Sequence, residues 1–383
     1  MNCDKNINTN IMKKIFISII LLFLPCYLYA QRSLPGKPIV HSVTIEFNDE
    51  IIKGYFILID ARTDEEKSQN IQKQTLDGSV IVFLQGHAQR PDDAYKFTSQ
   101  LAFNSKSGIV VVPVCDTPYG TDPSLHGDNG KIVILMELTR YALSYCNINI
   151  ANYSSDLIAK INENQVPFAK NKIIATLTAV GWSHGALLAR KISSKYDSVK
   201  NLVQICPSGY IDWSKYGCMS NCCIVSAFYW ESLRISKGIF KGNAKDIFSA
   251  GWGITKGITG DSCRSWSTCI NGNYNIFVLF RGYKDLSDVT DYETGNNYPV
   301  HNVSSITVIF GEDDSLFNAN KILNSKNSVN AEIMEKFFLT YFPEAGKNTK
   351  LHLFILPGNH LAPVLNYKDY VFHTLKYSDE LKK

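Results

Sequence analysis

The sequence lacks a large excess of charge of either sign. Its 383 residues include 39 Lys and Arg against 35 Asp and Glu, which gives a net charge of +4. This balance argues against a nucleic-acid partner, because such a partner calls for a strongly basic surface. Internal repeats and low-complexity tracts are also missing, and the 45% share of hydrophobic residues is that of an ordinary globular chain.

Apolar runs long enough to cross a membrane are missing as well. The longest, Ile15 to Leu24, follows Lys13-Lys14, and polar Gln31 comes directly after Ala30. A short apolar run with these flanks is typical of a secretory signal peptide rather than a membrane span. We therefore expect residues 1–30 to be a signal peptide and the mature chain to be secreted or periplasmic. Leu24-Pro25 before Cys26 lacks the small residues of a lipoprotein cleavage site, which argues against a lipid anchor.

The cysteines lack the paired spacing of a zinc cluster. No histidine lies near the Cys-x-x-x-Cys-Cys stretch, so we expect no metal. Eight of the ten cysteines remain after the signal peptide, and an even number in an exported chain favours disulfides over buried thiols. Cys115 and Cys146 are expected to pair with each other or to stay reduced. The other six are expected to pair among themselves: Cys206, Cys218, Cys222, Cys223, Cys263 and Cys269.

Apolar strands alternate with helices through most of the chain, after a hairpin over 42–59. Continuously apolar strands that alternate with helices indicate an α/β fold with a mostly parallel sheet covered on both faces. The buried strands are expected at 79–84, 108–114, 172–180, 199–205, 304–310 and 351–356. Helices are expected at 94–104, 131–146, 155–164, 186–192, 331–341 and 364–377, and residues 63–78 are expected to be a polar connection.

One region breaks this alternation. Residues 207–303 are rich in Trp, Tyr, Gly and Cys, which indicates an inserted cap or lid between two parts of one core, 31–206 and 304–383. The aromatic residues of this insertion allow two interpretations. One is an apolar lid that contacts lipid, and the other is a small core braced by disulfides.

The pentapeptide Gly181-Trp182-Ser183-His184-Gly185 stands between a predicted strand and a predicted helix. A serine in such a sharp turn is held in a strained conformation, and the residues two positions before and after it must be small. The two glycines meet that requirement. The pattern alone is weak, but its strand-to-helix context favours a nucleophilic Ser183.

Other reactive groups follow the ends of predicted strands. These are Gly86-His87, Asp313-Asp314 and His360. The carboxyl ends of parallel strands meet at one edge of a sheet, where α/β proteins bind ligands. A serine needs a base to take its proton, a histidine can be that base, and a carboxylate fixes the histidine's tautomer. The sequence therefore predicts a Ser-His-Asp arrangement.

With these motifs the chain resembles the α/β-hydrolases, over nearly everything after residue 40 except the insertion. The resemblance implies an eight-stranded, mostly parallel sheet with a cap, and backbone N–H groups of His87 and His184 as oxyanion donors. Gln85-Gly86 replaces the usual His-Gly pair of the oxyanion loop. The Gly311-x-x-Asp spacing favours Asp314 as the acid, with Asp313 and Asp212 as alternatives.

The sequence accordingly predicts an exported serine hydrolase that cleaves carboxylic esters through an acyl-enzyme, without a cofactor. Lipids, polyesters and small esters are all candidate substrates, and Trp182 and Tyr119 are expected to border the substrate pocket. A peptidase or amidase on the same fold is the alternative enzyme. A binding protein on a hydrolase scaffold is the alternative outside enzymes, although such proteins usually lose a member of the triad. The oligomeric state stays open.

Overall fold

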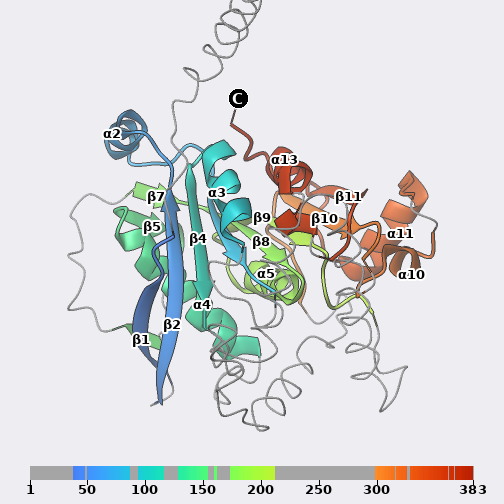
Figure 1. Ribbon diagram of the computed structural model, residues 1–383, viewed down its shortest axis with the longest axis horizontal. Helices are drawn as coiled ribbons and strands as arrows, with labels where there is room; N and C mark the ends of the chain where they lie inside the picture. Colours follow the sequence, from blue (N-terminus) through green and yellow to red (C-terminus); the bar gives the residue numbers. More distant parts are fainter. Residues whose placement is uncertain are drawn as a thin grey trace, which may run out of the picture.

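The computed structural model describes most of the chain outside its N-terminus and the predicted insertion (Figure 1). The described residues are 38–47, 50–86, 94–115, 128–153, 159–161, 173–211, 298–314, 316–325, 328–360, 362–365 and 367–382. The predicted signal peptide and nearly all of the predicted insertion lie outside these residues. The domain boundaries proposed from the sequence therefore stay predictions.

A nine-stranded sheet forms the centre of the described structure. Its strand order is β11-β10-β9-β8-β3-β4-β2-β1-β6, and a separate two-stranded sheet pairs β5 with β7. The six strands from β11 to β4 run parallel, whereas β2, β1 and β6 are antiparallel to their neighbours. The strands are β1 His41–Phe47, β2 Glu50–Asp60, β3 Val80–Leu84, β4 Ile109–Val114, β5 Ile148–Ile150, β6 Ala159–Ile161, β7 Ile173–Ala175, β8 Leu177–Trp182, β9 Val199–Ile205, β10 Ser305–Gly311 and β11 Lys350–Leu356.

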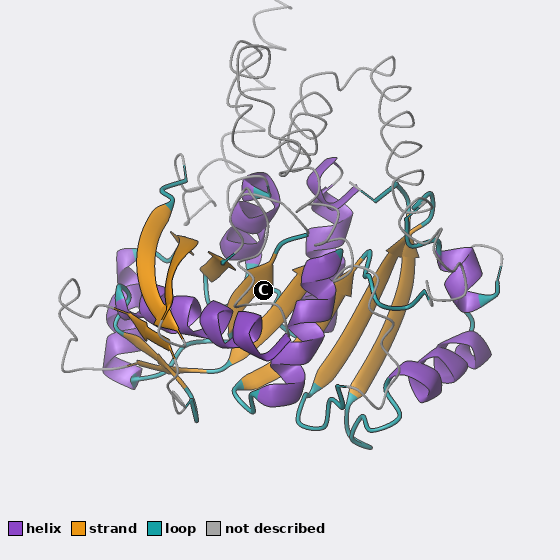
Figure 2. Cartoon of the chain, turned by 90° about the horizontal axis from the view of Figure 1, so that it is seen from below, coloured by secondary structure: helices purple, strands orange, loops and turns teal. Residues whose placement is uncertain are grey.

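Helices cover both faces of this sheet, as the sequence predicts. They are α2 Asp64–Lys73, α3 Tyr95–Asn104, α4 Asp128–Ser144, α5 His184–Lys195, α10 Ala319–Leu323, α11 Ala331–Tyr341, α12 Ala362–Leu365 and α13 Tyr367–Tyr377. Figure 2 shows the strands changing direction progressively across the sheet, which is the twist that strand sterics impose. Within the described residues no helix is both long enough and apolar enough to span a membrane.

The central strand β3 explains why both faces must be covered. Every residue of its Val-Ile-Val-Phe-Leu sequence is buried, and successive side chains point to opposite faces. Val82 lies in a core cluster with residues of α4 and α5, whereas Phe83 lies in the cluster formed with α3 and α13. The Phe83 ring packs on that of Phe97 at a centroid distance of 5.4 Å. Two cores, one on each face, therefore hold the strand ends in fixed positions.

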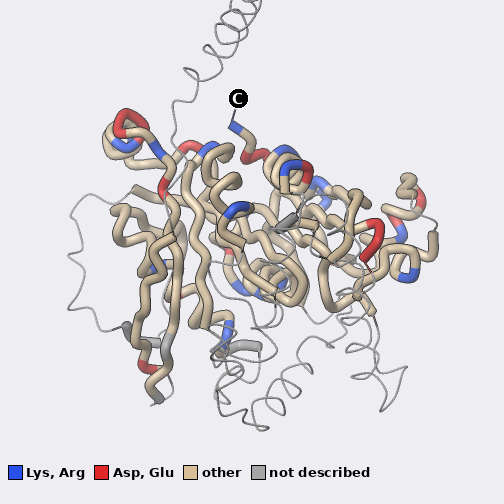
Figure 3. The backbone as a smooth tube through the Cα atoms, viewed as in Figure 1, with Lys and Arg blue, Asp and Glu red and all other residues tan. Residues whose placement is uncertain are grey.

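Three sequence predictions about local structure were wrong. The sheet has nine strands among the described residues rather than eight, because the short β6 adds to the edge beside β1. β6 also lies where we predicted a helix over 155–164. Residues 63–78 were predicted to be a connection, yet they contain α2. That helix begins with a capping box in which Thr63 and Glu66 bond reciprocally, and it has acidic residues in its first turn and Lys73 in its last (Figure 3).

A buried carboxylate joins the C-terminus to the amino ends of the central strands. Glu380 is 3% exposed, and its carboxylate accepts hydrogen bonds from Ser79 N (3.0 Å), Thr178 Oγ1 (3.3 Å) and Asn201 Nδ2 (3.4 Å). Ser305 Oγ donates in turn to Asn201 Oδ1 at 2.9 Å. These groups come from or adjoin β3, β8, β9 and β10. The carboxylate therefore bonds directly to groups of or beside β3, β8 and β9, and Asn201 links it to β10, all at the end of the sheet opposite Ser183.

Glu380→Ala is expected to lower the free energy of unfolding by about 2–4 kcal/mol, because it leaves buried donors without an acceptor. The loss should depend on pH. Burial raises the pKa of Glu380, so the folded state binds the proton more tightly than the unfolded state. The stability that this group contributes is then fully present below the ordinary glutamate pKa and is lost as the pH rises through the folded pKa.

Urea unfolding of wild type and variant at several pH values between about 4.5 and 8 tests this expectation. The difference in the free energy of unfolding between wild type and Glu380→Ala should be largest at the acidic end of this pH range. Asp379→Asn is the matched control, because the Asp379 carboxylate is exposed and pairs with Lys106 at the surface. The control should change stability by less than about 0.5 kcal/mol. A stability difference between wild type and Glu380→Ala that grows as the pH rises would contradict a raised pKa of Glu380 in the folded state.

Candidate active site

Ser183 occupies the sharp turn between β8 and α5. Its backbone has φ 57° and ψ −124°, a left-handed conformation that a residue other than glycine rarely adopts. The turn is held from the neighbouring strand, since Ser183 N donates to Ile205 O at 2.9 Å. Ser183 O accepts from Ala186 N at 3.0 Å and from Ser208 N at 3.2 Å. A strained serine fixed on both sides is the geometry that the sequence motif predicts.

The two flanking glycines leave room for this turn. A Cβ on Gly181 would overlap the carbonyl oxygen of Gly185. A Cβ on Gly185 would in turn overlap the carbonyl oxygens of Leu84 and Gln85. All of these atoms belong to backbone, which cannot move aside as a flexible side chain can. The close approach of β3, β8 and α5 thus depends on glycine at both positions.

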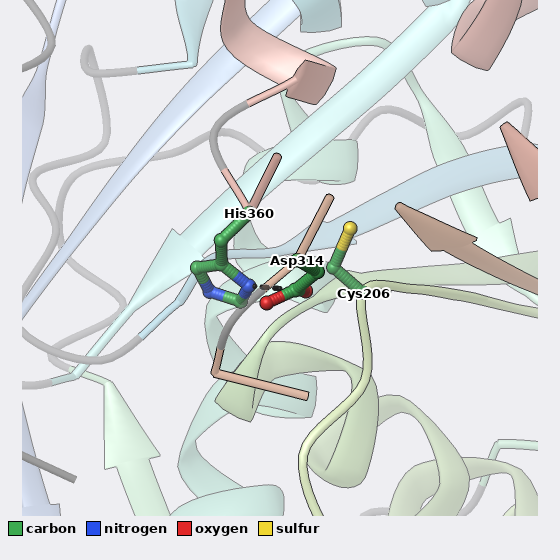
Figure 4. A group of neighbouring side chains, drawn as sticks. All are labelled: Cys206, Asp314 and His360. Atoms are coloured by element: carbon green, nitrogen blue, oxygen red, sulfur yellow. Dashed lines mark hydrogen bonds and ion pairs between the residues drawn. The ribbon is translucent and has the colours of Figure 1, made fainter. Parts of the chain in front are cut away.

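Asp314 and His360 form a buried pair at the same edge of the sheet. Asp314 follows β10, His360 follows β11, and these two strands are parallel neighbours. His360 Nδ1 lies 2.9 Å from Asp314 Oδ2, and the two residues are 4% and 0% exposed (Figure 4). The other carboxylate oxygen accepts from Leu316 N at 2.9 Å and Phe317 N at 3.0 Å. Asp313, the rival acid, is exposed.

This pairing assigns the histidine tautomer. An ionised carboxylate only accepts hydrogen bonds, so the proton lies on His360 Nδ1 and leaves Nε2 with its lone pair. The imidazole is also held from its sides. The Phe317 ring meets it edge-on at a centroid distance of 5.3 Å, and the Trp182 ring lies at 5.9 Å. A histidine fixed in this way can act as a base through Nε2.

Trp182 has a position that the sequence did not reveal. Its indole Nε1 donates to His360 O at 3.0 Å, and the residue is 1% exposed. The side chain next to the serine thus holds the backbone of the histidine. We expected Trp182 to border the pocket, and in the structure its indole packs inside the core that α3 and α13 cover.

The expected oxyanion donors are described only in part. His184 is the first residue of α5, and the N-terminus of a helix favours negative charge. His87 and Tyr119 lie outside the described residues, as does the alternative acid Asp212. Gln85, which begins the predicted oxyanion loop, is 7% exposed, and within the described part of the chain neither its amide nitrogen nor its amide oxygen has a hydrogen-bond partner.

Cys206 is a neighbour of the Asp314–His360 pair that the sequence did not predict. It follows β9 with φ 44°, is 0% exposed, and its backbone N donates to Ile309 O at 2.7 Å. In the structure Cys206 forms no disulfide, so its predicted pairing with a cysteine of the insertion is not seen. Figure 4 shows Cys206 beside Asp314. Cys206 follows β9, and β9 pairs with β10, the strand that precedes Asp314.

Cys146 is a thiol in a polar contact of its own. Its Sγ donates to Asp60 Oδ2 at 3.6 Å, and Arg62 pairs with the same carboxylate at 2.9 Å. Burial raises the pKa of Cys146 to about 12, with the charge of Asp60 as a further cause. No disulfide joins two of the described residues, so of the two options for Cys115 and Cys146 the structure has them without a bond to each other.

No family model matches the sequence, and no curated protein matches it. Solved structures do resemble it. A thermophilic esterase from Thermogutta terrifontis, with malate bound, is 10% identical at a TM-score of 0.51, over 88% of this chain and 97% of that one. An alpha/beta hydrolase enzyme from a Medee basin deep-sea metagenome library is 14% identical at 0.49, over 89% and 98%. An epoxide hydrolase from Bacillus megaterium is 10% identical at 0.45, over 88% and 100%.

The likeness to the esterase, together with the sheet order and the turn at Ser183, shows the α/β-hydrolase fold. The prediction of an α/β-hydrolase fold with a mostly parallel sheet is therefore confirmed, whereas nearly all of the predicted cysteine-rich cap lies outside the described residues.

Proposed function

We propose that the chain is a serine hydrolase that cleaves carboxylic esters. One observation carries the proposal. A strained Ser183 lies at the same sheet edge as the buried Asp314–His360 pair, and Trp182, the residue before the serine, bonds to the histidine backbone. In the α/β-hydrolase fold this edge is where strands of fixed position present reactive side chains. Structural work on the Thermogutta protein describes it as an esterase, which agrees with this proposal.

The first half of the reaction forms an acyl-enzyme. His360 Nε2 takes the proton of Ser183 Oγ as that oxygen attacks the ester carbonyl carbon. The carbonyl oxygen becomes an oxyanion, which the backbone N–H of His184 would stabilise together with that of His87. The C–O bond to the alcohol then breaks, and the alcohol oxygen takes the proton from His360 Nε2. Asp314 stays ionised and stabilises the imidazolium throughout.

The second half hydrolyses the acyl-enzyme. A water molecule gives its proton to His360 Nε2 as its oxygen attacks the acyl carbon. Ser183 Oγ leaves, recovers the proton from Nε2, and releases the carboxylic acid. No cofactor enters either half, since one nucleophile, one base and one carboxylate account for every proton.

A peptidase or amidase would use the same groups, and the difference lies in the leaving group. An amine is a poorer leaving group than an alcohol and needs its proton from His360 earlier in the step. We retain esters as the first substrate class and amides as the alternative. Lipid or polyester substrates, contact with lipid through the insertion, and export to the periplasm or the exterior are further parts of this proposal.

Labelling with a fluorophosphonate followed by peptide mapping tests the class. The reagent phosphonylates an activated serine, so we expect one labelled peptide that contains Ser183, and loss of hydrolysis of p-nitrophenyl acetate in proportion to labelling. Parallel assays with matched acyl p-nitroanilides separate esterase from amidase. A fully folded protein without label and without hydrolysis would favour the binding-protein alternative.

A further inference from the structure

Three buried side chains of different chemistry lie close together, and one of them is the candidate base. One ligand atom from each of Cys206, Asp314 and His360 lies within 4.8 Å of the other two. The exposed fractions of these residues are 0%, 0% and 4%. Figure 4 shows the three residues side by side, with the Cys206 sulfur turned away from the His360–Asp314 contact; they follow three adjacent strands, β9, β10 and β11. The proposed hydrolysis uses only two of the three, and the thiol has no role in it.

A fourth polar group lies close by. The hydroxyl of Tyr370 is buried and has no hydrogen-bond partner among the residues that the structure describes. If Gly358 carried a Cβ, that atom would lie 3.9 Å from the Tyr370 hydroxyl oxygen. The Gly358 carbonyl oxygen accepts a hydrogen bond from Asp313 N at 2.9 Å. Burial raises the pKa of Tyr370, and the charge of Asp314 raises it further. A buried hydroxyl without a partner among the described residues calls for an explanation.

We propose that Cys206, Asp314 and His360 form an inhibitory binding site for a thiophilic divalent cation, with zinc as the reference ion. Thiolate, carboxylate and imidazole are the three side-chain ligands that zinc takes in proteins. At bond lengths of about 2.0–2.3 Å, a tetrahedral ion holds its ligand atoms about 3.3–3.8 Å apart. Shifts of at most about 1 Å would bring the three atoms to those separations.

Protons and charges balance in this site. The Cys206 thiol releases its proton, and the two negative ligands then equal the charge of the ion. When the ion binds His360 Nδ1, the proton of that nitrogen moves through water to Nε2, so the imidazole stays neutral. Nε2 then has no lone pair with which to accept the proton of Ser183. Metal binding would therefore stop hydrolysis without any contact with the serine.

Burial sets the rate at which this inhibition develops. All three residues are at most 4% exposed, so the ion must wait for a local opening of the structure. We expect inhibition by zinc to develop slowly, with a rate that reaches a plateau as zinc increases. A chelator should reverse it at a similarly slow rate.

The first experiment measures ester hydrolysis by the full mature chain after incubation with zinc. The activity of wild type should fall by a factor of at least about ten. Cys206→Ala should need at least about tenfold more zinc for the same loss of activity, as expected when one ligand is removed. Cys146→Ala is the matched control, because it removes a cysteine at a different site, and it should be inhibited like wild type. Equal inhibition of wild type and Cys206→Ala would overturn the proposal.

The second experiment does not depend on hydrolysis. Cobalt(II) is titrated into the Ser183→Ala protein, and we expect one equivalent to produce a thiolate-to-cobalt charge-transfer absorption that zinc abolishes. The band should be absent from the Ser183→Ala, Cys206→Ala double variant. Cys206→Ser is the replacement if the alanine variant does not fold. A band that persists without Cys206 belongs to other cysteines and would overturn the proposal, even if the chain proves not to be an esterase.

Discussion

Replacement of Ser183 by alanine is expected to lower kcat for ester hydrolysis by about 10⁴-fold or more. The reason is that no other group at this position can form the acyl-enzyme. The conformational cost of φ 57° is about the same for alanine as for serine, so the strained turn should persist. The melting temperature of the variant should therefore stay within about 2 °C of that of wild type. Steady-state kinetics with p-nitrophenyl acetate and a thermal unfolding curve together check this result.

Ser193→Ala is the control, because Ser193 lies on α5, the helix that directly follows Ser183. Ser193 Oγ donates to Ala189 O at 2.8 Å within α5 and is buried, so its removal tests the general effect of losing a hydroxyl from this helix. We expect less than about a threefold change in kcat for it. A burst of acylation that survives in Ser183→Ala would contradict the assignment of the nucleophile.

The position of the candidate site could be predicted because it depends on local rules. Gly181 and Gly185 mark a turn in which backbones approach closely, and the structure has those backbones in contact. Asp314 and His360 each follow a parallel strand, and parallel neighbours place their carboxyl ends together. The alternation of strands and helices indicated a parallel sheet, and the contact between these two side chains also needs β10 and β11 to be neighbours, which the structure shows.

The neighbours of the site could not be predicted, because they depend on side-chain directions across elements distant in sequence. Nothing in the sequence indicates that the Trp182 indole turns to a carbonyl 178 residues away, or that Cys206 adopts φ 44° beside the acid. β6 has only three residues, too few for a periodic pattern, and its pairing with β1 is a tertiary contact. The polar composition of α2 hid a helix whose one clear signal was its capping box.

Replacement of Asp314 by asparagine is expected to lower kcat by about 10³–10⁴-fold with little change in KM. The asparagine amide can donate to His360 Nδ1, which would move the imidazole proton to Nε2 and remove the base. The fold should survive, because the asparagine side-chain oxygen can still accept from Leu316 N and Phe317 N, which bond to Asp314 at 2.9 and 3.0 Å. The measurement is kcat and KM for wild type and variant on one ester, with Tm as the check on folding.

Asp313→Asn is the matched control, since the two carboxylates are adjacent in sequence and only Asp314 is both buried and bonded to the histidine. We expect Asp313→Asn to change kcat by less than about threefold, because an exposed carboxylate affects the imidazole only through screened charge. A larger loss from Asp313→Asn than from Asp314→Asn would transfer the role of the acid to Asp313. Full activity in both variants would point to a carboxylate from the insertion, for which Asp212, just after β9, is the first candidate.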